Sequence, residues 1–249
     1  MAVYAGIDIG SRTVKLVLLE NRRIVKVAVA DTTYDPIAVC RSMFNGVECR
    51  SITATGYGRH LFFSEQPCNL VSEIKAVAIG ARFLWDECRA VLDVGGQDTK
   101  IVTLDERGKL DKFLMNDRCA AGTGRFLEVM AGALSYTYDQ FAEAALTATK
   151  AEKLNSMCTV FAESEVISQV ARGASRESIA LGIHEAIASR TLSMIKGLSL
   201  SGTILFAGGG AKNPCLRRCI EAGLGKPVHI PDNPRVVAAL GAALCNFEN

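Results

Sequence analysis

The segment Gly6-Ile7-Asp8-Ile9-Gly10-Ser11 joins two apolar stretches near the start of the chain. Those stretches, residues 3–9 and 13–20, are rich in Val, Ile and Leu, which favour β-strands. Glycine in the connecting loop lets backbone N–H groups approach an anion without an intervening side chain. An aspartate at a strand end suits hydrated magnesium, because this ion prefers carboxylate and water oxygens. The segment therefore predicts a strand–loop–strand unit that handles phosphate.

The same design recurs in Leu92-Asp93-Val94-Gly95-Gly96-Gln97. An offset of 85 residues, from position 8 to position 93, also superposes Lys15 on Lys100. Two lobes that open in the same way imply a cleft between them, where the loops could hold a polyphosphate and Mg²⁺. We expect a first lobe at residues 1–88 and a second at 89–249. The second includes a helical segment at 116–200, and a helix at about 234–246 packs back toward the first lobe.

A third glycine loop, Phe206-Ala207-Gly208-Gly209-Gly210, follows a predicted strand and could let a flat nucleoside lie against the backbone. Taken singly, each loop is better explained as a turn that uses glycine for its positive φ. Three loops in this order, two with a strand-end aspartate, favour a nucleotide site. The chain contains no Gly-x-x-x-x-Gly-Lys-Ser/Thr motif, so a P-loop is excluded as that site.

Hydrophobic periodicity and turn residues predict the other elements. From these patterns we predict strands at residues 24–30, 51–55, 90–94, 99–104, 109–115, 203–207 and 227–230. We predict a loop at 55–59 and helices at 36–44, 73–84, from 213 onward, 234–246 and, almost without break, 122–199.

Charge and hydropathy exclude several other classes of function. The 249 residues carry 28 Lys plus Arg against 26 Asp plus Glu, so no nucleic-acid face is expected. The chain shows neither a signal-peptide pattern nor an apolar stretch long enough to span a bilayer, and we expect a soluble, cytoplasmic protein. His60, His184 and His229 are scattered and are expected to be structural or exposed.

Two of the nine cysteines stand out, because Cys119 and Cys158 each precede a predicted helix. Free N–H groups and the helix dipole at that position favour a thiolate, the form that binds metals. Two thiolates cannot complete a 4Fe–4S site, which takes four, but a twofold dimer supplies the missing pair. The competing interpretation is a small residue that is merely tolerated at a helix start.

The three glycine loops resemble the phosphate-1, phosphate-2 and adenosine motifs of the actin-like (ribonuclease H-like) ATPase superfamily, an α/β fold with two similar lobes around a nucleotide cleft. The resemblance implies that residues 73–80 and 237–243 form the helices crossing between lobes. It implies Mg²⁺-binding or catalytic roles for Asp8, Asp93 and Gln97. It implies ATP contacts from Gly10, Ser11, Arg12, Thr13, Gly95, Gly96, Gly208, Gly209, Gly210 and Ala211.

The cysteine motifs Cys119-Ala-Ala-Gly-Thr-Gly-Arg-Phe and Cys158-Thr-Val-Phe-Ala-Glu-Ser-Glu closely resemble those of the activators (component A) of 2-hydroxyacyl-CoA dehydratases, which are similar to benzoyl-CoA reductase ATPase subunits. This resemblance implies a homodimer with one bridging 4Fe–4S cluster. It also implies ATP-driven transfer of a low-potential electron, taken from a donor such as ferredoxin or flavodoxin, to a dehydratase or related reductase. A small-molecule kinase of the same fold and an ATP-switched assembly protein remain the alternatives.

Overall fold

Two mixed β-sheets organise the computed structural model, which describes residues 2–117, 120–156, 158–196, 198, 200 and 202–247. The first sheet has the order β3-β2-β1-β4-β5 and the second has the order β8-β7-β6-β9. The first consists of β1 (Val3–Ile9), β2 (Thr13–Glu20), β3 (Arg23–Asp31), β4 (Ser51–Thr55) and β5 (Asn69–Leu70). The second consists of β6 (Cys88–Val94), β7 (Thr99–Leu104), β8 (Leu110–Asn116) and β9 (Thr203–Ala207).

The two sheets repeat one topology. In each, the first two hairpins are antiparallel, and the opening strand pairs in parallel with a later one: β1 with β4, and β6 with β9. Asp8 lies opposite Lys15 in the first hairpin, and Asp93 lies opposite Lys100 in the second. The repeat predicted from the sequence is therefore structural.

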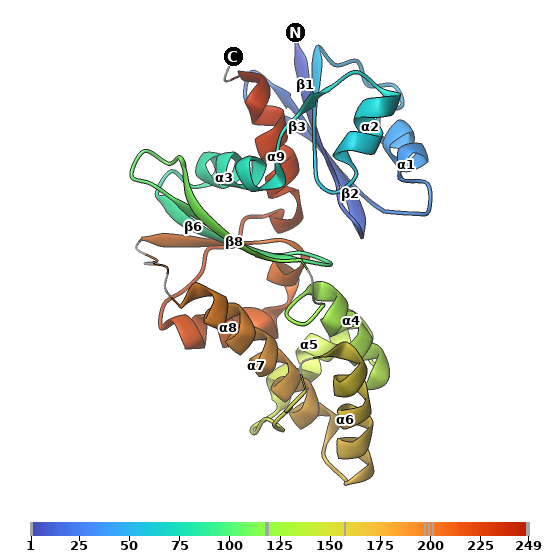
Figure 1. Ribbon diagram of the computed structural model, residues 1–249, viewed down its shortest axis with the longest axis vertical. Coiled ribbons are helices and arrows are strands. Elements are labelled where there is room, and N and C mark those ends of the chain that lie inside the picture. Colours follow the sequence, from blue (N-terminus) through green and yellow to red (C-terminus); the bar gives the residue numbers. More distant parts are fainter. Residues whose placement is uncertain are drawn as a thin grey trace.

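Helices cover both sheets, and several of them lie beyond the second sheet (Figure 1). They are α1 (Pro36–Met43), α2 (Arg59–Glu65), α3 (Glu73–Leu84), α4 (Gly124–Ala133), α5 (Tyr138–Thr147), α6 (Thr159–Ala171), α7 (Arg176–Ile195), α8 (Pro214–Leu224) and α9 (Val237–Leu244). Short 3₁₀ helices lie at Gly209–Lys212, Pro234–Val236 and Cys245–Phe247. None of the helices in the described ranges has the length and apolar character needed to cross a bilayer.

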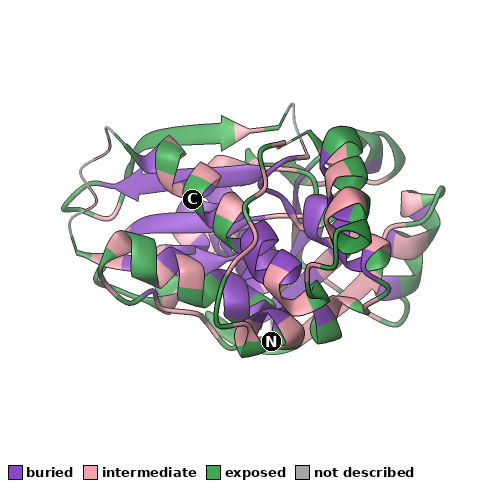
Figure 2. Ribbon diagram, turned by 90° about the horizontal axis from the view of Figure 1, so that it is seen from below, coloured by how far each residue is buried: buried purple, intermediate pink, exposed green. Residues whose placement is uncertain are grey.

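Helices α3 and α9 pack against each other between the two sheets (Figure 1). Every residue of α9 is buried, and its Leu240 and Leu244 pack with Val17 and Leu19 of β2. Helix α3 packs on the second sheet. Figure 2 shows this buried centre, with the edge strand β8 exposed. These are the two crossing helices that the resemblance implied.

The crossing depends on glycine. A Cβ atom at Gly241 would collide with the carbonyl oxygen of Ala76, and one at Gly80 would collide with that of Val237. The backbones therefore approach more closely than any side chain permits.

Three predictions of local structure were wrong in part. The region 122–199 is not continuously helical: residues 148–156 belong to no helix, and Glu152 N donates to Ser178 O at 2.9 Å. Residues 227–230 form only an isolated bridge between His229 and Leu205. The helix predicted at 234–246 is α9 flanked by two 3₁₀ turns, since Pro234 sets the backbone at its start. Helix α2, which begins at Arg59, was not predicted.

The division into lobes at residues 1–88 and 89–249, with a helical segment at 116–200 and a returning helix at 234–246, remains our proposal.

Gly241→Ala is expected to destabilise the protein by about 1–3 kcal/mol, because the added methyl group forces α3 and α9 apart. Gly132→Ala, in the exposed part of α4 where an added Cβ meets nothing, is the matched control and should be neutral or stabilising. Urea unfolding of both variants measures the difference. Equal stabilities would contradict the close crossing.

Candidate functional site

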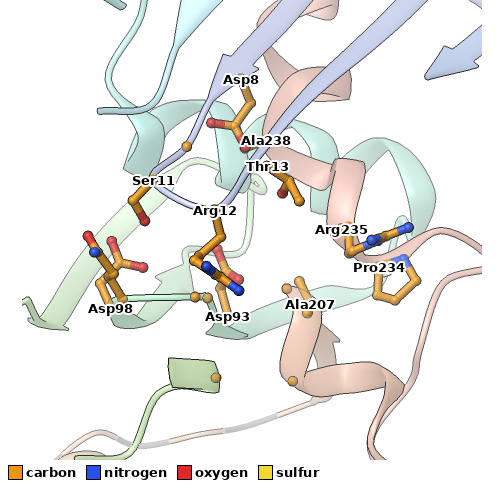
Figure 3. A pocket seen from close by; sticks show the side chains of 18 of the residues that line it. Asp8, Ser11, Arg12, Thr13, Asp93, Asp98, Ala207, Pro234, Arg235 and Ala238 are labelled. Carbon is orange, nitrogen blue, oxygen red and sulfur yellow. The ribbon is translucent and has the colours of Figure 1, made fainter. Parts of the chain in front are cut away.

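A cavity of about 460 Å³ opens between the two sheets and is lined by all three glycine loops. Figure 3 shows Asp8, Ser11 and Arg12 facing Asp93 and Asp98 across it. The predicted residues that line it are Asp8, Gly10, Ser11, Arg12, Thr13, Asp93, Gly95, Gly96, Gln97, Gly208, Gly209 and Gly210. Ala211 does not line the cavity and is buried in the 3₁₀ helix after the third loop. The topology thus assembles one cleft from three distant segments.

The first two loops close in the same way. Gly10 N donates to Thr13 O at 3.1 Å, and Gly95 N donates to Asp98 O at 2.9 Å. The third loop turns at Gly208, whose φ of 82° suits glycine, and Gly208 N donates to Pro234 O.

Each strand-end aspartate is accompanied by a buried lysine. Lys15 Nζ lies 2.8 Å from Asp8 Oδ2, while the buried Asp8 Oδ1 has no hydrogen-bond partner among the described residues. Burial alone would lower the pKa of Lys15, but the Asp8 carboxylate outweighs it and the pKa is raised. Lys15 is therefore charged, and one lone-pair-bearing oxygen of Asp8 remains to be satisfied by a cation or water.

In the second lobe, Lys100 lies closer to other carboxylates than to the strand-end aspartate. Lys100 Nζ lies 2.7 Å from Asp98 Oδ1 and 2.8 Å from Glu73 Oε1, but 4.0 Å from Asp93 Oδ2. Burial, reinforced by the charge of Asp8 and opposed by Lys100, raises the pKa of Glu73 to about 7. Burial also raises the pKa of Asp93. The cleft is thus rich in negative charge that its own lysines do not fully neutralise.

Sequence reasoning did not assign Lys15, Lys100, Glu73 or Asp98 to the site. The signal for the two lysines was present, because each lies seven residues after its aspartate and in register across a hairpin. Glu73 gave no such signal, since only the crossing of α3 brings its side chain into the cleft.

The second glycine loop is bound to α4. Gly124 N donates to Gly95 O and Arg125 N donates to Gly96 O, both at 2.9 Å. N–H groups at a helix start usually lack partners within the helix, and here the loop carbonyls supply them. Arg12 of the first loop also reaches α4, through an ion pair with Glu128 at 2.9 Å. Both loops are therefore bonded directly to α4, so a displacement of either loop would act on this helix.

Cys158 is the N-cap residue of α6 and is exposed. The loop before it is held by Glu165, which accepts hydrogen bonds from the backbone N–H groups of Asn155 and Ser156 at 2.9 Å. Cys119 lies outside the described residues. Within the part of the chain that is described, no group of three or more His, Cys, Asp or Glu side chains is placed to hold a metal ion.

Helix α6 carries an apolar face that the chain itself leaves uncovered. Its exposed members are Val160, Phe161, Ile167 and Val170, each at least 43% exposed. Only Ala162 and Val166 of this helix are buried. Helix α6 packs on α4, so the exposed thiol and the second glycine loop are joined through one helix contact.

The two sheets share one topology and enclose a cavity that contains two strand-end aspartates. This arrangement defines an ATPase of the actin-like fold. The chain belongs to the BadF/BadG/BcrA/BcrD ATPase family, which it matches over residues 5–246. It is 40% identical to the activator of lactoyl-CoA dehydratase from Anaerotignum propionicum, over 98% of this chain and 96% of the relative.

Two solved structures share its fold. Component A of (R)-2-hydroxyglutaryl-CoA dehydratase from Acidaminococcus fermentans superposes with a TM-score of 0.91 at 35% identity, over 98% of this chain and 97% of that one. The activator of 2-hydroxyisocaproyl-CoA dehydratase from Clostridium difficile, with bound ADPNP, also gives 0.91, at 36% identity over 99% and 94%. The predicted fold, ATPase activity and family are thereby confirmed.

His184 predicts a pH dependence of stability. Its ring is fully buried, and burial lowers its pKa from 6.5 to about 4, despite hydrogen bonds to Ala180 and Asn213 that act the other way. The unfolded chain therefore takes up this proton before the folded chain does. The contribution is complete above pH 6.5 and is lost as the pH falls toward 4, amounting to about 2 kcal/mol between pH 7 and pH 5.

Urea unfolding at pH 7 and pH 5 measures this contribution. His184→Gln should show a loss smaller by that amount, whereas the exposed-residue control His60→Gln should behave like the unmodified protein. An identical pH dependence in His184→Gln would refute the assignment.

Proposed function

We propose that this protein is an ATP-dependent activator, which hydrolyses ATP to pass a low-potential electron from a 4Fe–4S cluster shared by two copies of the chain to a 2-hydroxyacyl-CoA dehydratase-type partner. The observation that carries the proposal is an exposed thiol, Cys158, at the start of a helix joined through α4 to the phosphate loops of an ATPase. The relatives named above, activators of such dehydratases, support the same function.

The carboxylates of the cleft fit a magnesium–nucleotide complex. Magnesium in nucleotide sites is held by one or two carboxylates together with phosphate and water oxygens, so a larger protein cage is not required. In this proposal Asp8 and Asp93 hold Mg²⁺ through water, and Gln97 orients the attacking water. The backbone of the glycine loops, with Ser11 and Thr13, binds the phosphates. Burial raises the pKa of Glu73 and Asp93, and bound magnesium would favour their charged forms.

The described residues include one of the two cysteines that each chain would contribute to the cluster. Cys158 is accessible at a helix N-terminus. A second copy of the chain packed on the apolar face of α6 would bring its own Cys158 close by, since a twofold interface presents the same patch twice. Cys119 of each chain would complete the four thiolates, and the cluster would supply one-electron chemistry.

The coupling follows from the hydrogen bonds at the start of α4. When ATP is hydrolysed, the groups that bind Gly95 and Gly96 change, and these residues hold Gly124 and Arg125 of α4. Helix α4 packs on α6, so the thiol at the start of α6 is displaced with it. The electron donor in this proposal is a ferredoxin or flavodoxin, the protein works in the cytoplasm as a homodimer, and no nucleic acid or membrane takes part.

Asp93→Asn is expected to lower kcat for ATP hydrolysis about 10²- to 10³-fold while nucleotide binding persists, because it removes a charge from the reaction centre but keeps the side chain's shape. Asp86→Asn, on the exposed Asp86, is the matched control and should leave hydrolysis unchanged. Phosphate release under steady-state conditions measures both. Full activity of Asp93→Asn would remove Asp93 from the mechanism.

Cys158→Ser is expected to abolish the cluster. Protein purified without oxygen should be brown, with iron and sulfide corresponding to one cluster per two chains, and the variant should be colourless. Cys68→Ser, on a half-buried cysteine that lies in the first lobe, should retain the iron. Full iron in Cys158→Ser would exclude it as a ligand. Colourless unmodified protein that phosphorylates a small molecule would instead support a kinase.

A further inference from the structure

The side chain of Arg12 spans the cleft from the first glycine loop to helix α4, and the function proposed above gives it no part in hydrolysis. Its backbone is fixed, because its carbonyl oxygen accepts from Thr32 N at 2.9 Å. Its aliphatic stem lies on the second glycine loop, where a Cβ atom at Gly96 would stand 2.5 Å from Arg12 Cγ. Figure 3 shows Arg12 reaching from the first loop toward Asp93. The guanidinium group therefore lies where the two glycine loops meet.

One nitrogen of this guanidinium makes the whole contact with α4. Arg12 Nη2 lies 3.0 Å from Oε1 and 2.9 Å from Oε2 of Glu128, and both residues line the cleft. The Nε and Nη1 groups of Arg12 make no hydrogen bond with any residue that the structure describes. Because an arginine presents its donors in a rigid planar fork, this second edge can bind another anion while Nη2 stays on Glu128.

Glu128 is itself held in place on α4. Its Oε2 also accepts from Arg125 Nη1 at 3.2 Å, one turn earlier in the helix. The start of α4 is bonded to the carbonyl groups of Gly95 and Gly96, so the carboxylate belongs to the same unit on which the Arg12 stem lies. An exposed ion pair alone contributes less than about 1 kcal/mol. The stem contact and the ion pair together therefore position the guanidinium.

The two lysines at these loops are already bound to carboxylates. Lys15 Nζ lies 2.8 Å from Asp8 Oδ2, and Lys100 Nζ lies 2.7 Å from Asp98 Oδ1, so the charge of each is largely balanced. Hydrolysis of ATP redistributes negative charge among the β- and γ-phosphate oxygens, and a cation with unused donors beside them lowers the barrier. Arg12 has such donors, and it stands between the loops that would bind these phosphates.

We propose that Arg12 is a catalytic residue of ATP hydrolysis, whose Nε and Nη1 groups donate to the β- and γ-phosphate oxygens, and that Glu128 is the positioning residue that directs them. In this step the oxygen of a water molecule bonds to the γ-phosphorus. The bond from this phosphorus to the oxygen shared with the β-phosphate breaks, its electron pair stays on ADP, and the water releases one proton as inorganic phosphate forms. The inference rests on the proposed function only in that ATP is hydrolysed in this cleft.

Arg12→Ala tests the catalytic role through the difference between turnover and binding. The variant should lower kcat for ATP hydrolysis about 10²- to 10³-fold, while the affinity for a non-hydrolysable ATP analogue, measured by titration calorimetry, falls by much less. Arg41→Ala is the matched control: Arg41 forms an exposed ion pair with Glu65 at 2.7 Å outside the cleft, so neither quantity should change. An unchanged kcat in Arg12→Ala, even with weaker binding, overturns the proposal.

Chemical rescue gives a second readout, which a merely structural role would not move. Arg12→Ala leaves room beside Glu128 for a free guanidinium ion, which supplies the same planar donors. Guanidinium chloride, at concentrations far below those that unfold the protein, should raise kcat of Arg12→Ala and leave that of Arg41→Ala unchanged. Sodium chloride at the same ionic strength should have no such effect. An equal increase with sodium chloride would contradict a specific guanidinium role.

Glu128→Gln tests the positioning, because it keeps the length of the side chain and removes its charge. It should lower kcat by less than Arg12→Ala does and leave the affinity for the analogue unchanged, and in the Arg12→Ala background it should cost less than about twofold more. Independent, multiplicative losses of kcat would refute a positioning role. Unmodified protein that hydrolyses no ATP would overturn the proposed function as well, whereas normal hydrolysis by Arg12→Ala contradicts this inference alone.

Discussion

Uncompensated negative charge between the two sheets is the constraint on which the rest of this structure depends. Asp8, Glu73, Asp93 and Asp98 share one cleft, where Lys15 and Lys100 bind three of them. Burial, with the neighbouring carboxylates, raises the pKa values of Glu73 and Asp93, and one oxygen of Asp8 has no hydrogen-bond partner among the described residues. Burying carboxylates without full compensation costs stability, and this cost fits the magnesium–nucleotide site proposed above.

The close crossing of α3 and α9 keeps that charge together. Glycines at positions 80 and 241 let the two backbones touch, and the sheets on either side then present Asp8 and Asp93 to the same space. The N-terminus of α3 carries Glu73 into the cleft, where Lys100 of the second sheet binds it. The contact that joins the sheets therefore also completes the site.

The contacts of the helices beyond the second sheet likewise serve two purposes. The first N–H groups of α4 are bound by carbonyls of the second glycine loop, and the exposed Cys158 begins the helix packed on α4. Backbone hydrogen bonds and helix packing, which are stiffer than long side chains, thus connect the cleft with Cys158. The exposed ion pair between Arg12 and Glu128 adds a weaker link at the mouth of the cleft.

By itself, the sequence determined what is local. It marked the strand-end aspartates, the glycine loops, the repeat of 85 residues and the two cysteine motifs, because strands, turns and helix starts depend on neighbouring residues. It misjudged residues 148–156 and 227–230, where contacts with distant segments decide the backbone. Only the tertiary structure decided that Glu73 joins Lys100, that α4 is held by Gly95 and Gly96, and that Asn213 bonds His184. These contacts join residues that are far apart in the chain. They form only when the elements pack together, so no local sequence pattern predicts them.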